Sequence, residues 1–188
     1  MALTSSVMRD LGTALPSFTL PNVTNVLAKS ISQHDALGEK GILVAFICNH
    51  CPYVVHIRDV FTTLANSWVD RGLGVVAISA NDVENYPQDG PEAMADLAQE
   101  LGFRFPYLYD ETQDVAKAFD AVCTPDFFLF DAAGKLVYRG QFDASRPGND
   151  QAITGSNLSQ AVERLLHGQE PLAEQLPSVG CNIKWKTA

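Results

Sequence analysis

The sequence predicts a single α/β domain in which helices cover a mixed β-sheet. Two continuous apolar runs, Ile42–Ile47 and Val75–Ser79, have the pattern of strands that are buried on both faces. Segments with helical periodicity alternate with these runs, and a predicted hairpin follows them. The length of 188 residues suits one hydrophobic core, so we expect one domain over residues 1–188.

The first half of the chain predicts a hairpin, a strand and a long helix. Apolar residues around Phe18–Leu20, followed by a polar stretch up to Ile31, indicate a short N-terminal hairpin. After the strand Ile42–Ile47, apolar residues recur at spacings of three and four, which is typical of a helix with one buried face. This apolar stripe consists of Val54, Ile57, Phe61, Leu64 and Trp68. The polar segment Asp70–Gly72 ends the predicted helix.

The second half predicts two helices and an edge strand. A helix is expected from about Glu92 to Leu101, with a short strand at Phe105–Leu108. Pro106 restricts that strand to the edge of a sheet. The segment Asp110–Gln113 has the spacing of a capping box and predicts the start of the next helix.

The last elements are a hairpin, a helix and a tail. The runs Asp126–Phe130 and Leu136–Tyr138, joined by a turn that contains Gly134, predict a β-hairpin. Ser156 or Asn157 is expected to cap a final helix. The tail, residues 169–188, is expected to pack on the domain or to extend from it.

The composition excludes several classes of function. The net charge of −9 and the pI near 4.7 leave no basic stripe for nucleic acid. No run approaches the ~20 apolar residues of a membrane span. The first ten residues lack the basic and apolar regions of a secretory signal. We therefore expect a cytoplasmic protein with no nucleic-acid or membrane partner.

The segment Cys48-Asn49-His50-Cys51 carries the predicted chemistry. It joins the first buried strand to the long helix, so its thiols lie where backbone N–H groups and the helix dipole favour a thiolate. This arrangement is typical of a redox-active dithiol. Cys48 is the predicted nucleophile and Cys51 the resolving thiol. His50, by donating to the Cys48 thiolate or placing positive charge near it, would make the disulfide a stronger oxidant.

These residues resemble the thioredoxin-like superfamily, and more closely the bacterial thiol-disulfide oxidoreductases of the redoxin or AhpC/TSA-like branch. The dithiol after the first central strand and Thr124-Pro125 before the late hairpin match the superfamily. The closer resemblance is carried by Phe46–Val54, Asn81–Asp82, Tyr86–Asp89, Thr124-Pro125 and Gly180–Trp185, the last with the pattern Gly-Cys-x-Ile-Lys-Trp.

The resemblance implies a thioredoxin-like fold and an enzyme that exchanges the Cys48–Cys51 dithiol or disulfide with substrate disulfides or dithiols. It also implies a cis peptide bond at Thr124-Pro125, with the Thr124 backbone placed to pair with an extended substrate. No organic cofactor is needed, because the dithiol is itself the redox group. The expected partners are a protein or small-molecule disulfide or dithiol and a thiol reductant.

Two further cysteines are possible accessory redox groups. Cys123 lies next to Thr124 in the sequence and is either a buried apolar residue or a second redox partner. Cys181 lies in the tail motif, where it could pair with Cys123, relay electrons to the dithiol or simply pack. Four cysteines allow three complete pairings, and the sequence does not select one. The acidic residues Asp82, Glu84 and Asp89 are most simply explained as solvated loop positions.

Two alternatives come from other classes of function. Cys51-Pro52 at a helix start resembles the peroxidatic site of a peroxiredoxin, which would give an antioxidant thiol peroxidase. The hydroxyl residue and the proline expected three and seven positions earlier are replaced by Cys48 and Val44. The second alternative is zinc or copper bound by Cys48, Cys51, Cys181 and either His50 or Cys123. No second Cys-x-x-Cys motif supports a metal, and we expect none.

Overall fold

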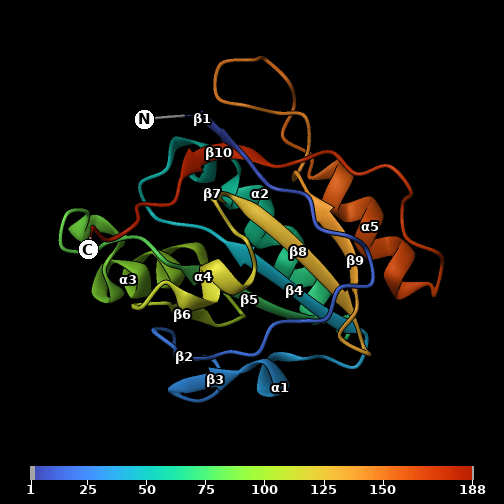
Figure 1. Ribbon diagram of the computed structural model, residues 1–188, viewed down its shortest axis with the longest axis horizontal. Helices are drawn as coiled ribbons and strands as arrows, with labels where there is room; N and C mark the ends of the chain where they lie inside the picture. Colours follow the sequence, from blue (N-terminus) through green and yellow to red (C-terminus); the bar gives the residue numbers. More distant parts are fainter. Residues whose placement is uncertain (1–2, 188) are drawn as a thin grey trace.

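The computed structural model describes residues 3–187; Met1, Ala2 and Ala188, the ends of the predicted domain and tail, lie outside it. Its centre is a five-stranded sheet (Figure 1). In spatial order the strands are β6 (Tyr107–Tyr109), β5 (Gly74–Ser79), β4 (Gly41–Phe46), β8 (Asp126–Asp131) and β9 (Leu136–Gly140). The first three run parallel, whereas β8 and β9 are antiparallel to their neighbours. The predicted mixed sheet, edge strand and late hairpin are confirmed.

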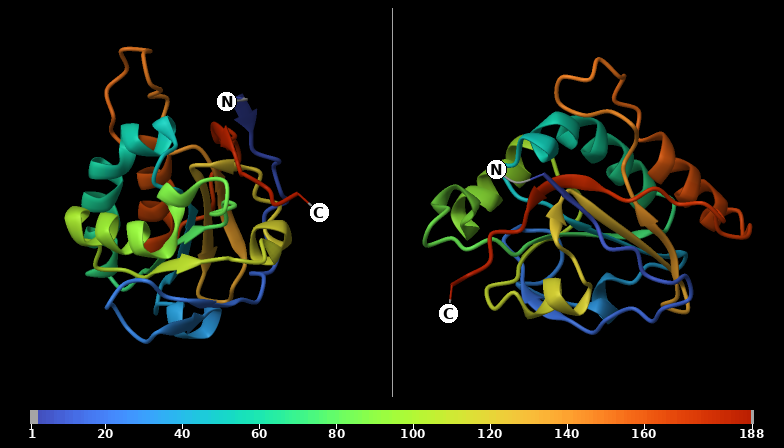
Figure 2. Two further views of the ribbon diagram at one scale, coloured as in Figure 1. Left: turned by 90° about the vertical axis from the view of Figure 1, so that its left-hand side faces the viewer. Right: turned by 45° about the horizontal axis from the view of Figure 1, so that its top comes forward.

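Helices and a small hairpin cover the two faces of this sheet (Figure 2). One face packs against α2 (Pro52–Val69), α3 (Pro91–Leu101) and α5 (Ser156–Leu166). The other packs against α1 (Gln33–Ala36), α4 (Asp114–Ala118) and the hairpin of β2 (Thr19–Pro21) and β3 (Ser30–Ser32). The N-terminal hairpin is thereby confirmed. Within residues 3–187, no helix combines the length and the apolar character needed to cross a bilayer.

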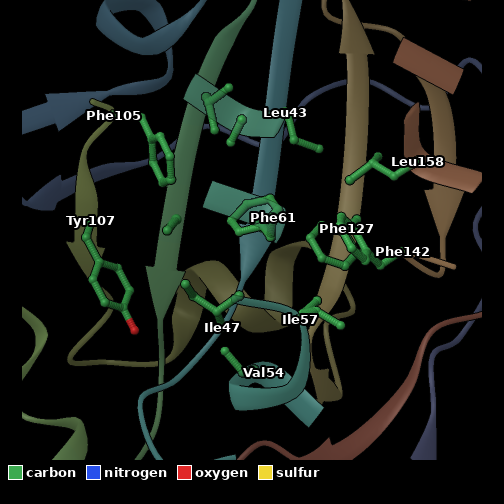
Figure 3. Close-up of a cluster of buried hydrophobic side chains, with 14 of the residues drawn as sticks. Leu43, Ile47, Val54, Ile57, Phe61, Phe105, Tyr107, Phe127, Phe142 and Leu158 are labelled. Atoms are coloured by element: carbon green, nitrogen blue, oxygen red, sulfur yellow. The ribbon is translucent and has the colours of Figure 1, made fainter. Parts of the chain in front are cut away.

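The central strand β4 is fully buried because each face of the sheet has its own apolar core. Leu43 and Ala45 point into the core under α2, and Ile42, Val44 and Phe46 point into the other. In the first core, Phe61 of α2 packs against Phe105, Phe127 and Phe142 with ring centroids 5.4–6.2 Å apart (Figure 3). This packing fixes the start of α2, and therefore the dithiol, against the end of β4.

The tail returns to the domain as a strand. β10 (Val179–Asn182) pairs antiparallel with both β1 (Leu3–Ser5) and β7 (Cys123–Thr124), and this small sheet lies beside the carboxyl end of β4 (Figures 1 and 2). Cys181 lies opposite Thr124 in the register. A Cβ at Gly180 would lie 2.0 Å from the Thr124 carbonyl oxygen, so glycine permits this close approach.

Both predicted helix caps are wrong. Gln113, with φ of 65°, is the N-cap of α4, and its side-chain amide donates to the carbonyls of Ala80 and Lys184. Gly155, with φ of 64°, is the N-cap of α5. Glycine is favoured at this position because a Cβ there would overlap Leu64 and Phe142. In both cases tertiary contacts override the local capping preference.

Candidate active site

The two thiols of the Cys48–Cys51 segment lie between β4 and α2. Cys51 is the N-cap of α2, and Pro52 follows at the first helical position, where a missing N–H costs nothing. Both cysteines are buried, with 1% and 0% of their surface exposed. Cys48, Cys51, Cys123 and Cys181 are present as thiols and not as disulfides.

The Thr124-Pro125 loop forms one wall of the site. Its peptide bond is cis, as expected. The Thr124 hydroxyl lies 3.4 Å from Cys48 Sγ, and the Thr124 carbonyl oxygen lies 3.2 Å from Cys51 Sγ. One residue therefore contacts both sulfurs.

Cys181 adds a third thiol beside Cys48 and Cys51, whereas the thiol of Cys123 is directed elsewhere. Cys181 Sγ lies 2.8 Å from Cys51 Sγ, and the backbone N–H of Tyr53 in the first turn of α2 also donates to the Cys181 sulfur. Cys123 instead directs its Sγ at the Pro125 carbonyl oxygen, 3.9 Å away, and burial raises its pKa. The chain therefore brings Cys48, Cys51 and Cys181 together.

The segment between the thiols is held by Asp89. The carboxylate of Asp89 lies 2.6 Å from His50 Nδ1 and accepts the backbone N–H groups of Asn49 and His50 at 2.8 and 3.2 Å. Asn81 donates to the same carboxylate at 2.8 Å. Asp89 is completely buried, so the sequence-based interpretation of this residue as a solvated loop position is wrong. Its carboxylate is satisfied by the redox segment instead of by water.

Three more side chains complete the surroundings of His50. The Tyr86 ring stacks on the His50 ring, with centroids 5.4 Å apart and an interplanar angle of 9°, and Lys184 Nζ lies 5.7 Å from the centre of the Tyr86 ring. Tyr107 donates to the Asn49 side chain at 3.2 Å. The sequence pattern gave no role to Tyr107 or Lys184. Tyr86, Asp89 and Lys184 lie in runs that carried the family resemblance, which was the available signal, whereas Tyr107 lies outside these runs.

The chain was compared with known proteins. The model of the AhpC/TSA family matches residues 11–139, which span β2 to β9 and include the dithiol and the cis-proline loop. The chain belongs to the AhpC/TSA family. None of the curated proteins with which it was compared matches it.

Solved structures share the fold of this chain. A conserved protein from Geobacillus kaustophilus is 47% identical and superposes with a TM-score of 0.96 over 100% of this chain and 98% of that one. A hypothetical protein from Sinorhizobium meliloti 1021 is 42% identical, with a TM-score of 0.94 over 98% and 100%. The thioredoxin domain of a thiol-disulfide oxidoreductase from Bacteroides vulgatus shares the fold, at 19% identity and a TM-score of 0.57 over 82% and 99%.

In this AhpC/TSA-family site, when the dithiol is reduced, the thiolate is favoured at Cys51 over Cys48. A thiolate there receives hydrogen bonds from Cys48, Cys181, the Thr124 hydroxyl and the backbone N–H of Val54, which together lower the pKa of Cys51 to about 5. The hydrogen bond to Cys51, burial and the nearby Asp89 charge raise the pKa of Cys48. The sequence argument favoured a thiolate at Cys48. The structure differs because only Cys51 lies directly at the helix N-terminus.

The same residues include a possible set of metal ligands. Cys48 Sγ, a ring nitrogen of His50 and a carboxylate oxygen of Asp89 lie within 4.8 Å of one another. This set of three differs from the four-ligand set considered from sequence, because it contains Asp89 and lacks the thiols of Cys51 and Cys181. His50 Nδ1 and both Asp89 oxygens are already engaged in hydrogen bonds. A metal would therefore have to replace the contacts that hold the Cys48–Cys51 segment.

A buried ion pair supports the cis-proline loop from behind. Asp126, the residue after Pro125, lies 3.0 Å from the guanidinium of Arg139, and both side chains are fully buried. Arg139 also donates to the Asp120 carbonyl and lies 4.5 Å from the centre of the Phe128 ring. Burial raises the pKa of Asp126 to about 6, although Arg139 opposes the shift.

Proposed function

We propose that the protein is a thiol-disulfide oxidoreductase in which Cys48 and Cys51 form the redox-active pair. The observation that carries the proposal is the contact of both sulfurs with Thr124 of the cis-proline loop, at 3.4 and 3.2 Å. A metal site or a structural cysteine pair does not need a loop that contacts both sulfurs. A dithiol that exchanges with a substrate disulfide does, because its sulfurs must be held in line with that disulfide.

In the first step Cys48 attacks one sulfur of the substrate disulfide. The Cys51 thiolate, hydrogen-bonded to Cys48, takes the Cys48 proton as the new S–S bond forms. The substrate S–S bond breaks, and its electron pair leaves with the second substrate sulfur. The product is a mixed disulfide between Cys48 and the substrate, with Cys51 protonated.

In the second step Cys51 resolves this mixed disulfide. Its proton passes to the released substrate thiolate, and Cys51 then attacks Cys48. The substrate leaves with one thiol and one thiolate, which takes a proton from solvent, and the enzyme retains a Cys48–Cys51 disulfide. A thiol reductant returns the dithiol, and the same steps in reverse oxidise a substrate dithiol.

A small pocket of about 20 Å³ lies beside Pro125. Tyr53 and Ile57 of α2 line one side, and Phe142–Arg146 and Ser178–Val179 line the other. Its walls combine apolar surface with the guanidinium of Arg146. Because Thr124 already pairs with Cys181 of β10, a substrate would approach the dithiol without adding a strand at Thr124, and a protein or small-molecule disulfide is the proposed substrate class.

Reduction of a disulfide-linked peptide by dithiothreitol, with and without the protein, tests this function. We expect catalysis by the wild type and loss of at least 100-fold in Cys48→Ser. Cys123→Ser, which changes a thiol directed at Pro125, is the matched control and should retain activity. Peroxide reduction without disulfide exchange would favour the thiol peroxidase instead.

A further inference from the structure

We propose that Cys181 is a third redox thiol, which takes over the disulfide from Cys48 and converts the Cys48–Cys51 bond into a Cys51–Cys181 bond. This inference rests on the proposed function, since it concerns the fate of the disulfide formed there. It is carried by the 2.8 Å contact of the two sulfurs and by the way β10 holds Cys181 in place.

The position of Cys181 is built into the fold. β10 is fixed between β1 and β7, with Cys181 opposite Leu3 on one side and Thr124 on the other. Gly180 allows the strand to approach the Thr124 carbonyl closely. Cys181 is therefore held against the same loop that contacts Cys48 and Cys51, although it lies 130 residues from Cys51 in the chain.

Oxidation of the dithiol removes two of the three causes that keep Cys181 protonated, and burial remains. In the reduced site, burial, donation to Cys51 and the Cys51 charge raise the pKa of Cys181 to about 12. Formation of the Cys48–Cys51 disulfide removes the Cys51 thiolate, and with it the last two of these causes. The N–H of Tyr53 and the nearby Lys184 ammonium, which favour a Cys181 thiolate, remain.

The step is an internal exchange and needs no additional oxidant. The Cys181 thiolate attacks Cys51 Sγ, a bond forms between these sulfurs, and the Cys48–Cys51 bond breaks. The electron pair leaves on Cys48, which takes up the proton lost by Cys181. One disulfide and one thiol are present before and after the step. The result is a reduced Cys48 and a disulfide that links α2 to β10.

Disulfide mapping tests the proposal. The protein is equilibrated with glutathione buffers, quenched with acid, alkylated and cleaved after lysine and arginine. Cleavage leaves Cys48 and Cys51 together in peptide 41–58 and Cys181 in peptide 165–184. We expect the cross-linked pair of peptides in the wild type, with Cys48 alkylated, and in Cys48→Ser. The cross-link should be lost in Cys181→Ser and retained in Cys123→Ser.

The outcomes separate this inference from the proposed function. A wild-type protein that forms the disulfide within peptide 41–58 but never the cross-link overturns the role of Cys181 and leaves the dithiol function intact. Absence of both the disulfide within peptide 41–58 and the cross-link, in the wild type and in Cys181→Ser, contradicts the dithiol function and the transfer that follows from it. The wild-type result decides the matter even where Cys48→Ser fails to fold.

Discussion

The carboxylate of Asp89 lies 2.6 Å from Nδ1 of His50 and also accepts the backbone N–H groups of Asn49 and His50. A buried negative charge thus holds the segment between the redox thiols, and it raises the pKa of Cys48. His50 is the nearest group that can balance this charge. His50 is therefore expected to stabilise the reduced dithiol relative to the disulfide, and Asp89 is expected to destabilise it.

Replacement of His50 by alanine should lower the reduction potential. The change leaves the Asp89 charge without its imidazole partner, and this unbalanced negative charge beside the dithiol disfavours the thiolate of the reduced form. We expect a shift of tens of millivolts, since a tenfold change in the equilibrium constant corresponds to about 30 mV. Redox titration of His50→Ala measures it, with the exposed His167→Ala as control. An unchanged midpoint potential would show that His50 does not tune the reduction potential of the dithiol.

Asp89→Asn should raise the potential. Asparagine retains a carbonyl oxygen for the N–H groups of Asn49 and His50 but removes the negative charge beside Cys48. The reduced form is then stabilised relative to the disulfide. The same titration checks this, with Glu92→Gln as a control for loss of an exposed charge. A shift in the same direction as that of His50→Ala would contradict the electrostatic explanation.

Reduced protein should titrate one thiol near pH 5. The lowered pKa of Cys51 predicts a step in thiolate absorbance at about 5 that is absent from Cys51→Ser. An unfolded cysteine has a pKa of ~8.5. Because the folded value is lower, ionisation stabilises the reduced fold fully above the unfolded pKa, and this contribution is lost as the pH falls through about 5.

The matching stability measurement compares the reduced and disulfide forms. The free energy of unfolding of the reduced protein should rise relative to the disulfide form between pH 5 and pH 8, by up to ~1.4 kcal/mol per pH unit. Denaturant titrations of both forms at several pH values provide the difference. A difference that does not change with pH would show that Cys51 is not ionised in the fold.

Arg139→Met should destabilise the protein by ~3–5 kcal/mol, because it leaves the buried Asp126 carboxylate without its partner. The raised pKa of Asp126 sets the pH dependence of this loss. Below about 6 the carboxyl is neutral, so the cost of removing Arg139 should decrease as the pH falls. Unfolding at pH 5 and pH 7.5 tests this, and an equal loss at both values argues against a charged Asp126.

Gly180→Ala should separate the tail from the site. The added Cβ would overlap the Thr124 carbonyl, and forcing such a group into a packed site typically costs ~1–3 kcal/mol. We expect a lower unfolding free energy and loss of the Cys51–Cys181 cross-link. Val179→Ala, a half-buried position in the same strand, is the control. Wild-type stability and cross-linking in Gly180→Ala would mean that the close approach is not required.

The sequence predicted the central part of this fold because its signals are local. The continuous apolar runs of β4 and β5 reflect burial on both faces of the sheet, and the apolar stripe of α2 reflects burial of one face of the helix. The dithiol lies between the end of β4 and the start of α2. The short strands β7 and β10 have no such periodicity. They exist because the tail pairs with the cis-proline loop, a contact between distant parts of the chain.

The parts of the site that the sequence did not predict also depend on contacts between distant parts of the chain. A lone aspartate in a polar loop is usually solvated, and nothing in the sequence near Asp89 shows that Asn49, His50 and Asn81 will surround it. Cys181 could be recognised as a candidate from its motif. Its choice of Cys51 over Cys123 depends on the register of β10 against β7, which only the tertiary structure supplies.

A redox titration of the wild-type protein with mass mapping of its cysteines tests the central claim most directly. We predict that Cys51 loses its reactivity toward alkylation with a two-electron midpoint, bonded first to Cys48 and after the transfer to Cys181, while Cys123 stays reduced. Retention of free thiols at both Cys48 and Cys51 across the full range of buffers would contradict the assignment of this pair as the redox centre.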